Sequence, residues 1–527
     1  MSELAGSDTL GEILPLQASR AALAGRPALF FGDQAYSYVD LEAASAASAS
    51  RLEASGINEG DVVGLMLPNS PALVAHLFGV LRTGATVLPL NPALTPRELS
   101  VVLEDSRART VITSEELARR VEGLRTSSPA LKEVIAVDPR ALRSGPTVSL
   151  PSWVRGEPDG TAFLVYTAGT TGRPKGVILT HRNVLANTAQ VAERTGITRA
   201  DRVLHVMPLF HVNGLLNNTA LPLRAGAAIV LAPRFDPARF WGDVAAFRPT
   251  YFTAVPTVFA RLMDAWDGSI DASSLRFVRT GAAPMATALQ RRVERRLGVA
   301  VVASYGLTEA TCTCTMNPVG PERRVGSVGS ALLREVVRVV DVQGSPRAPG
   351  EVGEVVVQGP NVMAGYLNAP AETAEVLRDG WLYTGDLGYL DADGFLFLTD
   401  RKKDLIIRGG ENISPREVED VLELHPAVAE ASVVGAPDRE LGEEVAAFLV
   451  PRPGRAPDPD EVRGFCRERL ARFKVPRQIR IVPRLPVTSV GKVDKVRLRD
   501  LATSAERSLS PLTLPLPGGE RELSGGG

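Results

Sequence analysis

Short apolar runs separated by longer mixed stretches dominate the first part of the chain. Short continuous apolar runs of this kind are typical of buried strands. The runs are Val62–Leu67, Thr86–Leu90, Thr110–Thr113, Val134–Val137, Ala162–Val165 and Val299–Ala303. Helical patterns lie between them. This alternation of strands and helices predicts layered, mainly parallel sheets of the α/β class.

Two of the predicted helices have clear start signals. Ser70 is a cap residue followed by Pro71 at the first helical position, and this helix is expected to end near Gly84. The stretch Thr95–Glu98 forms a capping box that also carries proline at the first helical position. In parallel α/β sheets ligands bind at the loops beyond the carboxyl ends of strands. We therefore expect the functional residues in those loops.

The pattern becomes β-rich after Gly329. The runs Val336–Asp341 and Gly353–Gln358, separated by turn residues, predict a small barrel or distorted sheet. A charge cluster at Leu398–Asp404 is typical of a domain boundary, and an αββαβ-like pattern follows it. We expect a large N-terminal domain at 1–400 with a small β-barrel-like subdomain, a small α+β C-terminal domain at 401–505, and a disordered tail at 506–527 that is rich in Pro, Gly and Ser.

Composition narrows the class of protein. A chain of 527 residues with 44% hydrophobic and 23% charged residues is typical of a soluble globular protein with two or more domains. The net charge of -1 gives no bias toward nucleic acid or membrane surfaces. No run approaches the roughly 20 apolar residues of a membrane helix, and no signal peptide is seen. We expect a cytoplasmic protein without integral membrane association.

The three cysteines fit neither a disulfide framework nor a zinc site. Cys312 and Cys314 lie two residues apart, and Cys466 is remote from both. Cys466 shares one face of a predicted helix with Val462 and Phe465. We expect reduced cysteines, with Cys466 in a core.

The loop from Tyr166 to Gly176 follows a predicted strand and carries the strongest chemical signal. Its glycines let backbone N–H groups approach a ligand closely and form a concave anion site. Its hydroxyls and cations suit phosphate oxygens. The loop does not match the phosphate loop of nucleotide hydrolases, because its lysine is followed by glycine. A turn of small residues is the simpler alternative. The candidate polyphosphate-binding residues are Thr167, Ala168, Gly169, Thr170, Thr171, Gly172 and Lys175.

A second candidate is the string Ser304–Glu309 at the end of a predicted strand. Tyr305 offers a ring face for stacking, and Thr308 can donate a hydrogen bond to a phosphate. Glu309 is a hard oxygen ligand for Mg²⁺, which usually binds through one or two carboxylates plus substrate phosphates. A strand-to-helix turn with an acid at its start is the alternative.

Further polar residues occur in three strings that have simpler explanations. His211, in Met207–Gly214, is explained as an incidental histidine at a strand end. Asp386, on a predicted turn, can accept from two hydroxyls or form an Asx-type turn. Lys492 follows a glycine on a polar loop, where a lysine is usually solvated. The small residues Gly281, Ala282 and Ala283 form a loop along which a flat ligand could lie.

Taken together and in their order along the chain, these strings resemble the signature motifs of the adenylate-forming superfamily, which contains acyl-CoA synthetases, luciferases and the adenylation domains of peptide synthetases. The resemblance covers about residues 10 to 505. It implies that adenine lies between Tyr305 and the Gly281–Ala283 loop, that Asp386 binds the ribose and that Arg401 reaches the nucleotide. The cofactor-binding residues implied by the resemblance also include Ser304, Gly306, Lys403, Gly409 and Gly410.

The resemblance also implies moving parts. Lys403 matches the pivot on which a mobile C-terminal domain rotates, and Gly409–Gly410 lines a pantetheine tunnel. Lys492 matches a lysine that reaches the acyl carboxylate and α-phosphate, so the implied catalytic residues are Lys492, His211, Thr308 and Glu309, with Glu309 also the metal ligand. The implied substrate pocket comprises Phe210, His211, Asn213, Gly281, Gly306, Leu307 and Cys312.

The activity implied by the resemblance is that of an AMP-forming carboxylic acid–CoA ligase. It uses ATP, Mg²⁺ and coenzyme A, the last as a substrate, and a fatty acid is one candidate for the acid. Transfer of the acyl group to a separate carrier protein or an amine is the enzymatic alternative, and a non-catalytic nucleotide-binding protein is a second. No carrier domain is expected after the small domain. The acid is not determined by the sequence, and a homodimer is left open.

Overall fold

The structure is a computed structural model that describes residues 6–20, 22–23, 25–142, 154–167, 174–283, 285–402, 404–488 and 492–504. The chain folds into two compact units. The first comprises Met1–Lys403 together with Thr488–Lys492, and the second comprises Asp404–Val487 together with Val493–Gly527. The predicted tail at 506–527 lies outside the described residues.

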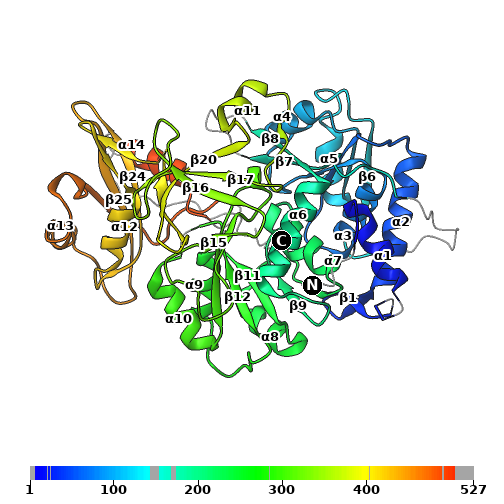
Figure 1. Cartoon of the computed structure of the whole chain (residues 1–527), viewed down its shortest axis with the longest axis horizontal. Helices are drawn as coiled ribbons and strands as arrows, with labels where there is room; N and C mark the ends of the chain where they lie inside the picture. Colours follow the sequence, from blue (N-terminus) through cyan, green and yellow to red (C-terminus); the bar gives the residue numbers. More distant parts are fainter. Residues whose placement is uncertain are drawn as a thin grey trace, which may run out of the picture. The chain divides into compact units, whose positions relative to one another are not determined.

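The first unit contains two mainly parallel sheets (Figure 1). Among the described residues, one sheet has seven strands in the order β18 (Gly365–Tyr366), β8 (Lys175–Thr180), β7 (Thr161–Thr167), β4 (Thr86–Pro89), β3 (Val62–Met66), β5 (Thr110–Ser114) and β6 (Glu133–Val137). The pairs that involve β8 are antiparallel, and the others are parallel.

The other large sheet has nine strands in the described part of the chain. Their order is β15 (Ser330–Ala331), β14 (Thr315–Met316), β13 (Ala300–Tyr305), β12 (Phe277–Thr280), β11 (Tyr251–Ala254), β9 (Arg202–His205), β10 (Ala228–Leu231), β1 (Pro27–Phe31) and β2 (Gln34–Ser37). From β13 to β1 all pairs are parallel. The predicted α/β class with mainly parallel sheets is confirmed.

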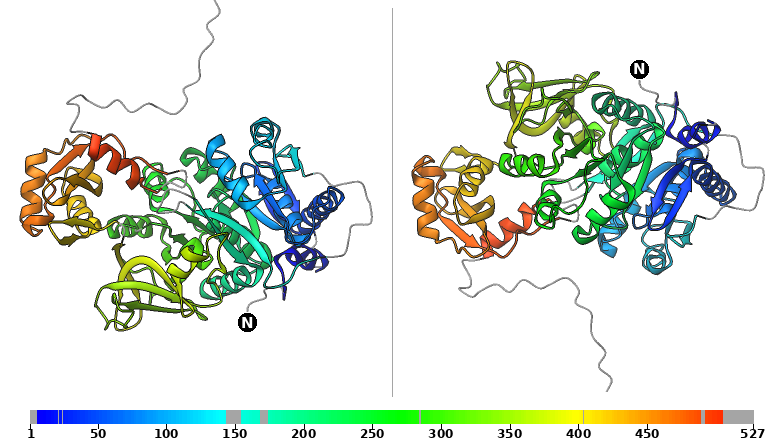
Figure 2. Two further views of the ribbon diagram at one scale, coloured as in Figure 1. Left: turned by 90° about the horizontal axis from the view of Figure 1, so that it is seen from above. Right: turned by 90° about the horizontal axis from the view of Figure 1, so that it is seen from below.

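Helices cover both sheets. They are η1 (Leu10–Glu12), α1 (Ile13–Ser19), α2 (Tyr38–Ala54), α3 (Pro71–Arg82), α4 (Pro96–Ser106), α5 (Glu115–Glu122), α6 (His181–Thr195), the π-helix η2 (Asn213–Ala220), α7 (Leu221–Arg224), α8 (Pro237–Phe247), α9 (Pro256–Asp264), α10 (Thr287–Leu297), η3 (Thr308–Ala310) and α11 (Pro370–Val376). Helices α8, α9 and α10 gather beside β11 and β12 (Figure 1). The segment with α1 and α2, dark blue in Figure 2, lies at one edge of this unit.

Three apolar clusters define the layers of the first unit. The central cluster joins both sheets to α1, α2, α3, α6 and α7. A second cluster lies between the nine-stranded sheet and α8–α10, and a third lies between the seven-stranded sheet and α4–α5. Each sheet is therefore buried on both faces, which explains why its strands read as continuous apolar runs in the sequence.

The predicted helix starts are confirmed. Ser70 accepts a hydrogen bond from the Leu73 backbone N–H at the start of α3, which carries Pro71 at its first position. Thr95 and Glu98 form a reciprocal capping box at the start of α4. Local capping therefore fixes where these helices begin.

A third sheet follows and is entirely antiparallel. Among the described residues it contains β16 (Val336–Val340), β17 (Gly353–Gln358), β20 (Trp381–Leu390), β19 (Leu377–Arg378) and β21 (Leu396–Arg401). Register shifts interrupt the pairing of β20 with both β17 and β21. Such bulges increase strand twist, in keeping with the small barrel or distorted sheet expected for this segment.

The second unit is a smaller α+β fold. Its described strands are β22 (Ile406–Arg408), β23 (Glu411–Ile413), β24 (Val428–Asp438), β25 (Gly442–Pro451) and β26 (Gln478–Ile481), and its helices are α12 (Pro415–Glu423), α13 (Pro459–Arg467), η4 (Arg472–Lys474) and α14 (Lys495–Ser504). Two apolar clusters show that α12 and α13 cover one face of this sheet and α14 the other. Cys466 is fully buried in the first cluster, as predicted.

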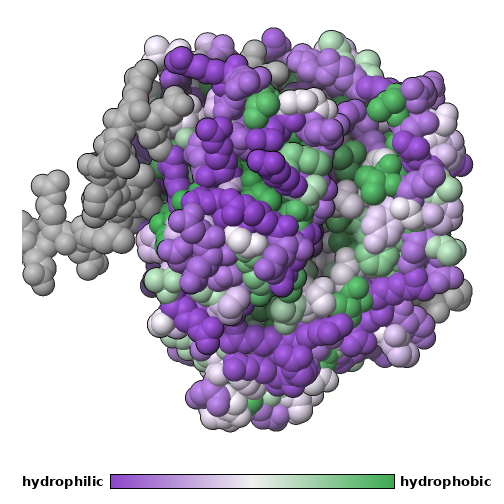
Figure 3. Space-filling view, turned by 90° about the vertical axis from the view of Figure 1, so that its left-hand side faces the viewer, coloured by the Kyte–Doolittle hydropathy of each residue, from purple (hydrophilic) through white to green (hydrophobic). Residues whose placement is uncertain are grey.

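Hydrophilic side chains predominate on the face drawn in Figure 3, with hydrophobic residues in scattered groups. Within the described residues, no helix has both the length and the apolar content needed to cross a membrane.

Candidate active site

The predicted motifs meet where β12 and β13 end. Thr280 and Ala303 are register partners on these neighbouring strands, so Gly281 and Ser304 follow them side by side. The Ser304 hydroxyl donates to the Thr280 carbonyl over 3.1 Å. Because both strands are parallel, their carboxyl ends open onto the same edge of the sheet, where α/β proteins bind ligands.

Tyr305, Asp386 and Arg401 form one group. The Tyr305 hydroxyl donates to Asp386 Oδ2 over 2.7 Å, and Arg401 Nε lies 2.8 Å from Asp386 Oδ1. The sheet causes the second contact, since Asp386 on β20 and Arg401 on β21 are register partners. Burial raises the pKa of Tyr305 well above its usual value, so the phenol remains a donor at neutral pH. Asp386 lies in a strand rather than on the predicted turn.

Glu309 and Lys175 meet through Tyr366. The Tyr366 hydroxyl donates to Glu309 Oε1 over 3.0 Å, and Lys175 Nζ lies 4.9 Å from the centre of the Tyr366 ring. Strand β18 carries Tyr366 beside β8, which begins at Lys175. Sequence reasoning missed Tyr366, because it stands outside every recognisable string.

The segment predicted to bind polyphosphate is described only at its two ends. Thr167 at the end of β7 pairs with Lys175 at the start of β8. Between them, the predicted residues Ala168, Gly169, Thr170, Thr171 and Gly172 lie outside the described residues. Of these two ends, Lys175 lies beside Tyr366, which contacts Glu309.

Phe210 and His211 stand next to each other, with ring centres 4.5 Å apart and planes tilted by 54°. Burial, aided by the positive charge of Lys492, lowers the pKa of His211 to about 4. The imidazole is therefore neutral at neutral pH. Its Nε2 is buried without a hydrogen-bond partner in the described part of the chain.

The structure brings Asn213 and Cys312 together through Asn217, which the sequence did not single out. Asn217 Nδ2 lies 3.4 Å from Asn213 Oδ1, 3.0 Å from Cys312 Sγ and 3.1 Å from Thr313 Oγ1. Asn213 and Asn217 share a face of η2 because they are one helical turn apart. The predicted substrate-pocket residues 213 and 312 are therefore neighbours.

The backbone after Gly306 is strained and tightly packed. A Cβ atom at Gly306 would lie 1.9 Å from the Cys312 carbonyl oxygen, so only glycine fits. Thr311 and Cys312 have φ values of 52° and 87°, which non-glycine residues rarely adopt. The turn is closed by the Cys312 N–H, which donates to the Leu307 carbonyl over 3.0 Å. Such strain is often retained where the backbone is held in place for a ligand.

Lys492 belongs to the first unit. Burial and the nearby Arg401 lower its pKa, whereas Asp386, Cys312 and Glu309 oppose that shift. The lysine thus lies among the carboxylates predicted to bind ribose and metal.

The remaining predicted residues include those of the expected pivot and pantetheine tunnel, and they do not belong to the groups described above. Lys403 lies outside the described residues. Gly409 and Gly410 belong to the second unit, where they form the turn between β22 and β23 with φ values of 58° and 89°. Thr308 begins η3 beside Glu309, while Ala282 and Ala283 continue the loop after β12.

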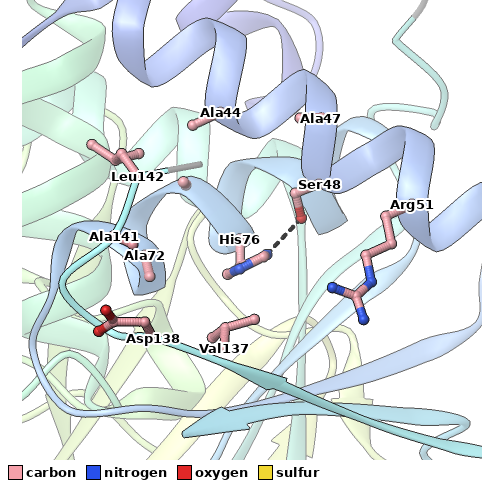
Figure 4. A pocket seen from close by; sticks show the side chains of 11 residues that line it. Ala44, Ala47, Ser48, Arg51, Ala72, His76, Val137, Asp138, Ala141 and Leu142 are labelled. Carbon is pink, nitrogen blue, oxygen red and sulfur yellow. Dashed lines mark hydrogen bonds between the residues drawn. The ribbon is translucent and has the colours of Figure 1, made fainter. Parts of the chain in front are cut away.

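A separate hollow lies between α2, α3 and the end of β6 (Figure 4). We call it the α2–α3 pocket. It has a volume of about 220 Å³ and is lined by Ala44, Ala47, Ser48, Arg51, Ala72, Ala75, His76, Val137, Asp138, Ala141 and Leu142. Ser48 Oγ and His76 Nδ1 lie 2.7 Å apart inside it. It contains none of the residues predicted from the motifs.

Comparison with known proteins shows to which family this chain is similar. The family model of AMP-binding enzymes matches residues 16–367, and that of the AMP-binding enzyme C-terminal domain matches residues 417–492. The sulfoacetate–CoA ligase of Cupriavidus necator is 40% identical over 84% of this chain and 88% of its own length. The long-chain-fatty-acid–CoA ligase of Bacillus subtilis is 35% identical over 94% and 95%.

Among solved structures, ATP-bound MatB from Rhodopseudomonas palustris superposes with a TM-score of 0.88 at 30% identity, covering 96% of this chain and all of that one. The motifs, the fold and both family models thus agree over nearly the whole chain. The protein is therefore an enzyme of the AMP-binding family and a member of the adenylate-forming superfamily.

Proposed function

We propose that the protein is an AMP-forming ligase that joins a carboxylic acid to coenzyme A. The carboxylate oxygen attacks the α-phosphorus of ATP, pyrophosphate leaves, and an acyl adenylate forms. The thiol of CoA then attacks the adenylate carbonyl, and AMP leaves. ATP supplies the driving force because a free carboxylate has no good leaving group.

The observation that carries this proposal is the convergence of Tyr305, Asp386 and Arg401. These residues come from three separate strings, and Tyr305 and Asp386 are 81 positions apart, yet both partners contact the Asp386 carboxylate within 2.8 Å. In our proposal adenine stacks on Tyr305, against Ser304, Gly306 and the Gly281–Ala283 loop, and Asp386 accepts hydrogen bonds from the ribose hydroxyls. A buried carboxylate held between a phenol and a guanidinium is pre-oriented for that role.

In our proposal Glu309, Lys175 and the adjoining loop bind the phosphates and Mg²⁺. No cluster of three or more His, Cys, Asp or Glu side chains that could hold a metal occurs among the described residues. A single carboxylate such as that of Glu309 is enough for Mg²⁺, because this ion commonly binds through one carboxylate together with substrate phosphates. Mg²⁺ would neutralise charge on the phosphates. Thr308, Lys175 and the loop 167–172 would hold the phosphate oxygens.

The acid would lie against Phe210, His211 and the turn from Gly306 to Cys312. A neutral His211 can donate to a carboxylate oxygen without the strong attraction of a full charge. Lys492 supplies that charge and would stabilise the negative charge that develops between carboxylate and α-phosphate. We infer that rotation of the C-terminal domain about Lys403 then brings Gly409 and Gly410 to the CoA pantetheine.

The names of relatives leave the acid open. They include sulfoacetate in C. necator, a long-chain fatty acid in B. subtilis, and ferulate in an Amycolatopsis species whose enzyme is 39% identical. A pocket with different side chains can therefore accept very different acids on this fold.

Release of AMP and pyrophosphate from ATP, measured across aliphatic, aromatic and doubly charged acids with and without CoA, tests the proposal. We expect AMP and acyl-CoA to form with one class of acid. Pyrophosphate release that CoA does not accelerate would indicate a carrier protein or an amine as acceptor instead. Absence of turnover with every acid, despite ATP binding, would favour a non-catalytic nucleotide-binding protein.

A further inference from the structure

Arg279 is a fully buried cation with unused hydrogen-bond donors. Only 1% of the surface of Arg279 is exposed. Its Nε and Nη1 atoms are both buried without a hydrogen-bond partner in the described part of the chain. None of the ion pairs found among the described residues includes it, whereas the buried Arg82 and the half-buried Arg408 each contact a glutamate.

The neighbours of Arg279 are also polar and also unpartnered. Thr253 is its register partner on β11, and Tyr251 lies two residues earlier on the same face of that strand. The hydroxyls of both are buried without partners among the described residues. We call Tyr251, Thr253 and Arg279 the Arg279 cluster.

The positive charge in this cluster has no counter-charge among the residues that the structure describes. The ionisable groups that interact with the guanidinium are the Cys312 thiol and the Tyr251 phenol. Burial raises the pKa of both, so both are neutral at neutral pH. Water could satisfy the N–H groups but could not neutralise the charge. An unpaired buried charge is strongly unfavourable, and fixed polar groups of this kind are expected to meet an anion.

The cluster adjoins the proposed acid site. Strand β12 runs from Arg279 through Thr280 directly into Gly281. Cys312, a predicted pocket residue, lies close enough to both Arg279 and Lys492 for their charges to favour its thiolate form. One thiol thus lies near two cations, of which Lys492 is proposed to meet the reacting carboxylate. Asn217 contacts the same thiol, and its Oδ1 is unpartnered in the described residues.

We propose that Arg279 binds a second anionic group on the acid, so that the substrate is a short acid carrying a carboxylate or sulfonate in addition to the carboxylate that reacts. The proposal rests on the proposed ligase activity. We expect a short acid because one residue, Cys312, lies near both Arg279 and Lys492, which would bind its two ends. The hydroxyls of Tyr251 and Thr253 are donors that would complete the binding of the second group.

Matched substrate pairs test this without altering the protein. Malonate is compared with its monoamide, and sulfoacetate with methylsulfonylacetate, so that each pair differs in the charge of one end. Pyrophosphate release with ATP and Mg²⁺ is measured for all four acids and for acetate, butyrate, a fatty acid and an aromatic acid. We expect kcat/KM for at least one doubly charged acid to exceed that of its partner by at least about 100-fold, because buried polar groups reject analogues that leave them unpaired. Which pair shows the preference distinguishes carboxylate from sulfonate.

Substitution of Arg279 provides the second arm. Arg279→Met should lower kcat/KM for the doubly charged acid about 100-fold and change that of its neutral partner by less than about 5-fold. Arg279→Lys keeps the charge and should recover part of the loss. Arg279→Met should also raise the melting temperature of the ligand-free protein, since it removes an unpaired buried charge.

The outcomes separate this inference from the proposed function. Equal rates within both pairs, or equal losses for charged and neutral acids in Arg279→Met, would overturn the role of Arg279. Turnover of fatty or aromatic acids alone would overturn it too, while leaving the ligase activity established. Silence with every acid would overturn the proposed function itself.

Discussion

The Arg279 cluster and the α2–α3 pocket both contain polar side chains of the first unit, yet their polar atoms are partnered differently. In the α2–α3 pocket, Ser48 Oγ and His76 Nδ1 satisfy each other over 2.7 Å, and the charged Arg51 and Asp138 are exposed to solvent. Burial lowers the pKa of His76 to about 4, so this pair carries no charge at neutral pH. In the Arg279 cluster a charged group is buried and unpartnered within the described residues.

The difference shows which property marks a binding site. A hollow lined mostly by apolar residues, with one satisfied pair and two charges that solvent already reaches, has little to offer a ligand, whatever its volume. A buried cation with free N–H groups has free energy to gain from an anion. We therefore expect changes near Arg279 to alter the chemistry of the enzyme and changes in the α2–α3 pocket to alter only its stability.

Loss of Lys492 should have the largest effect. Lys492→Ala removes the second cation near Cys312, and we expect the rate of adenylate formation to fall by about 1,000-fold or more, as for the loss of a major electrostatic group in a transition state. Binding of ATP should remain close to normal, because Asp386 and Tyr305 hold the nucleotide in our proposal. Pyrophosphate release in single-turnover mixing and ATP binding by calorimetry measure the two quantities.

Lys495→Ala is the matched control for that experiment. Lys495 lies three residues further along and pairs with Glu419 over 3.0 Å within the second unit. Its loss should cost less than about 1 kcal/mol of stability and leave the rate unchanged. Normal adenylation by Lys492→Ala would show that the role assigned to Lys492 is wrong.

Much of the fold could be predicted from the sequence because its signals are local. Ser70 with Pro71 and Thr95 with Glu98 mark helix starts by contacts that span a few residues. Strands such as β14 and β18 contain two residues each and follow no pattern, so they could not be predicted. The π-helical turns at 213–220 were equally hidden, since their geometry depends on tertiary packing.

Some residues of the candidate site could likewise be predicted from the sequence, and others could not. Tyr305 and Glu309 stand in a recognisable string, whereas Tyr366 reaches Glu309 from 57 positions away and has no string of its own. Arg279 reads in the sequence as an ordinary arginine before a loop. Only the three-dimensional structure reveals that its charge is buried and lacks a partner among the described residues.

Glu335 is a second buried ionisable residue that can be compared with Arg279. A bound proton, rather than a ligand, removes its charge. The residue is 6% exposed, accepts a hydrogen bond from Gln190 Nε2 over 3.2 Å, and has a pKa raised to about 9 by burial. The folded protein then keeps this proton between pH 4.5 and 9, while the unfolded chain releases it above its ordinary pKa of 4.5. Stability should therefore fall as pH rises through this window, by up to roughly 1.4 kcal/mol per unit.

Glu335→Gln should remove that dependence, since the amide stays neutral in both states. We expect the variant to match the wild type near pH 5 and to exceed it by a few kcal/mol at pH 8.5. Melting temperatures at pH 5, 7 and 8.5 provide the comparison. Parallel pH profiles for the two proteins would mean that Glu335 is ionised in the folded state and has an unidentified partner.

The smallest effect is expected in the α2–α3 pocket. Ser48→Ala breaks the bond to His76 Nδ1 and should cost about 1 kcal/mol of stability, the usual worth of one neutral hydrogen bond. It should leave kcat/KM for every acid within about 2-fold of the wild type, because the described part of the chain shows no contact of Ser48 with a residue placed at the acid or the nucleotide. Thermal melts and steady-state kinetics on the same preparation measure both. A change of 10-fold or more in kcat/KM with an unchanged melting temperature would contradict the comparison. The Ser48–His76 pair would then influence the reaction although its hydrogen bond is satisfied. The α2–α3 pocket would have to be treated as a site coupled to catalysis.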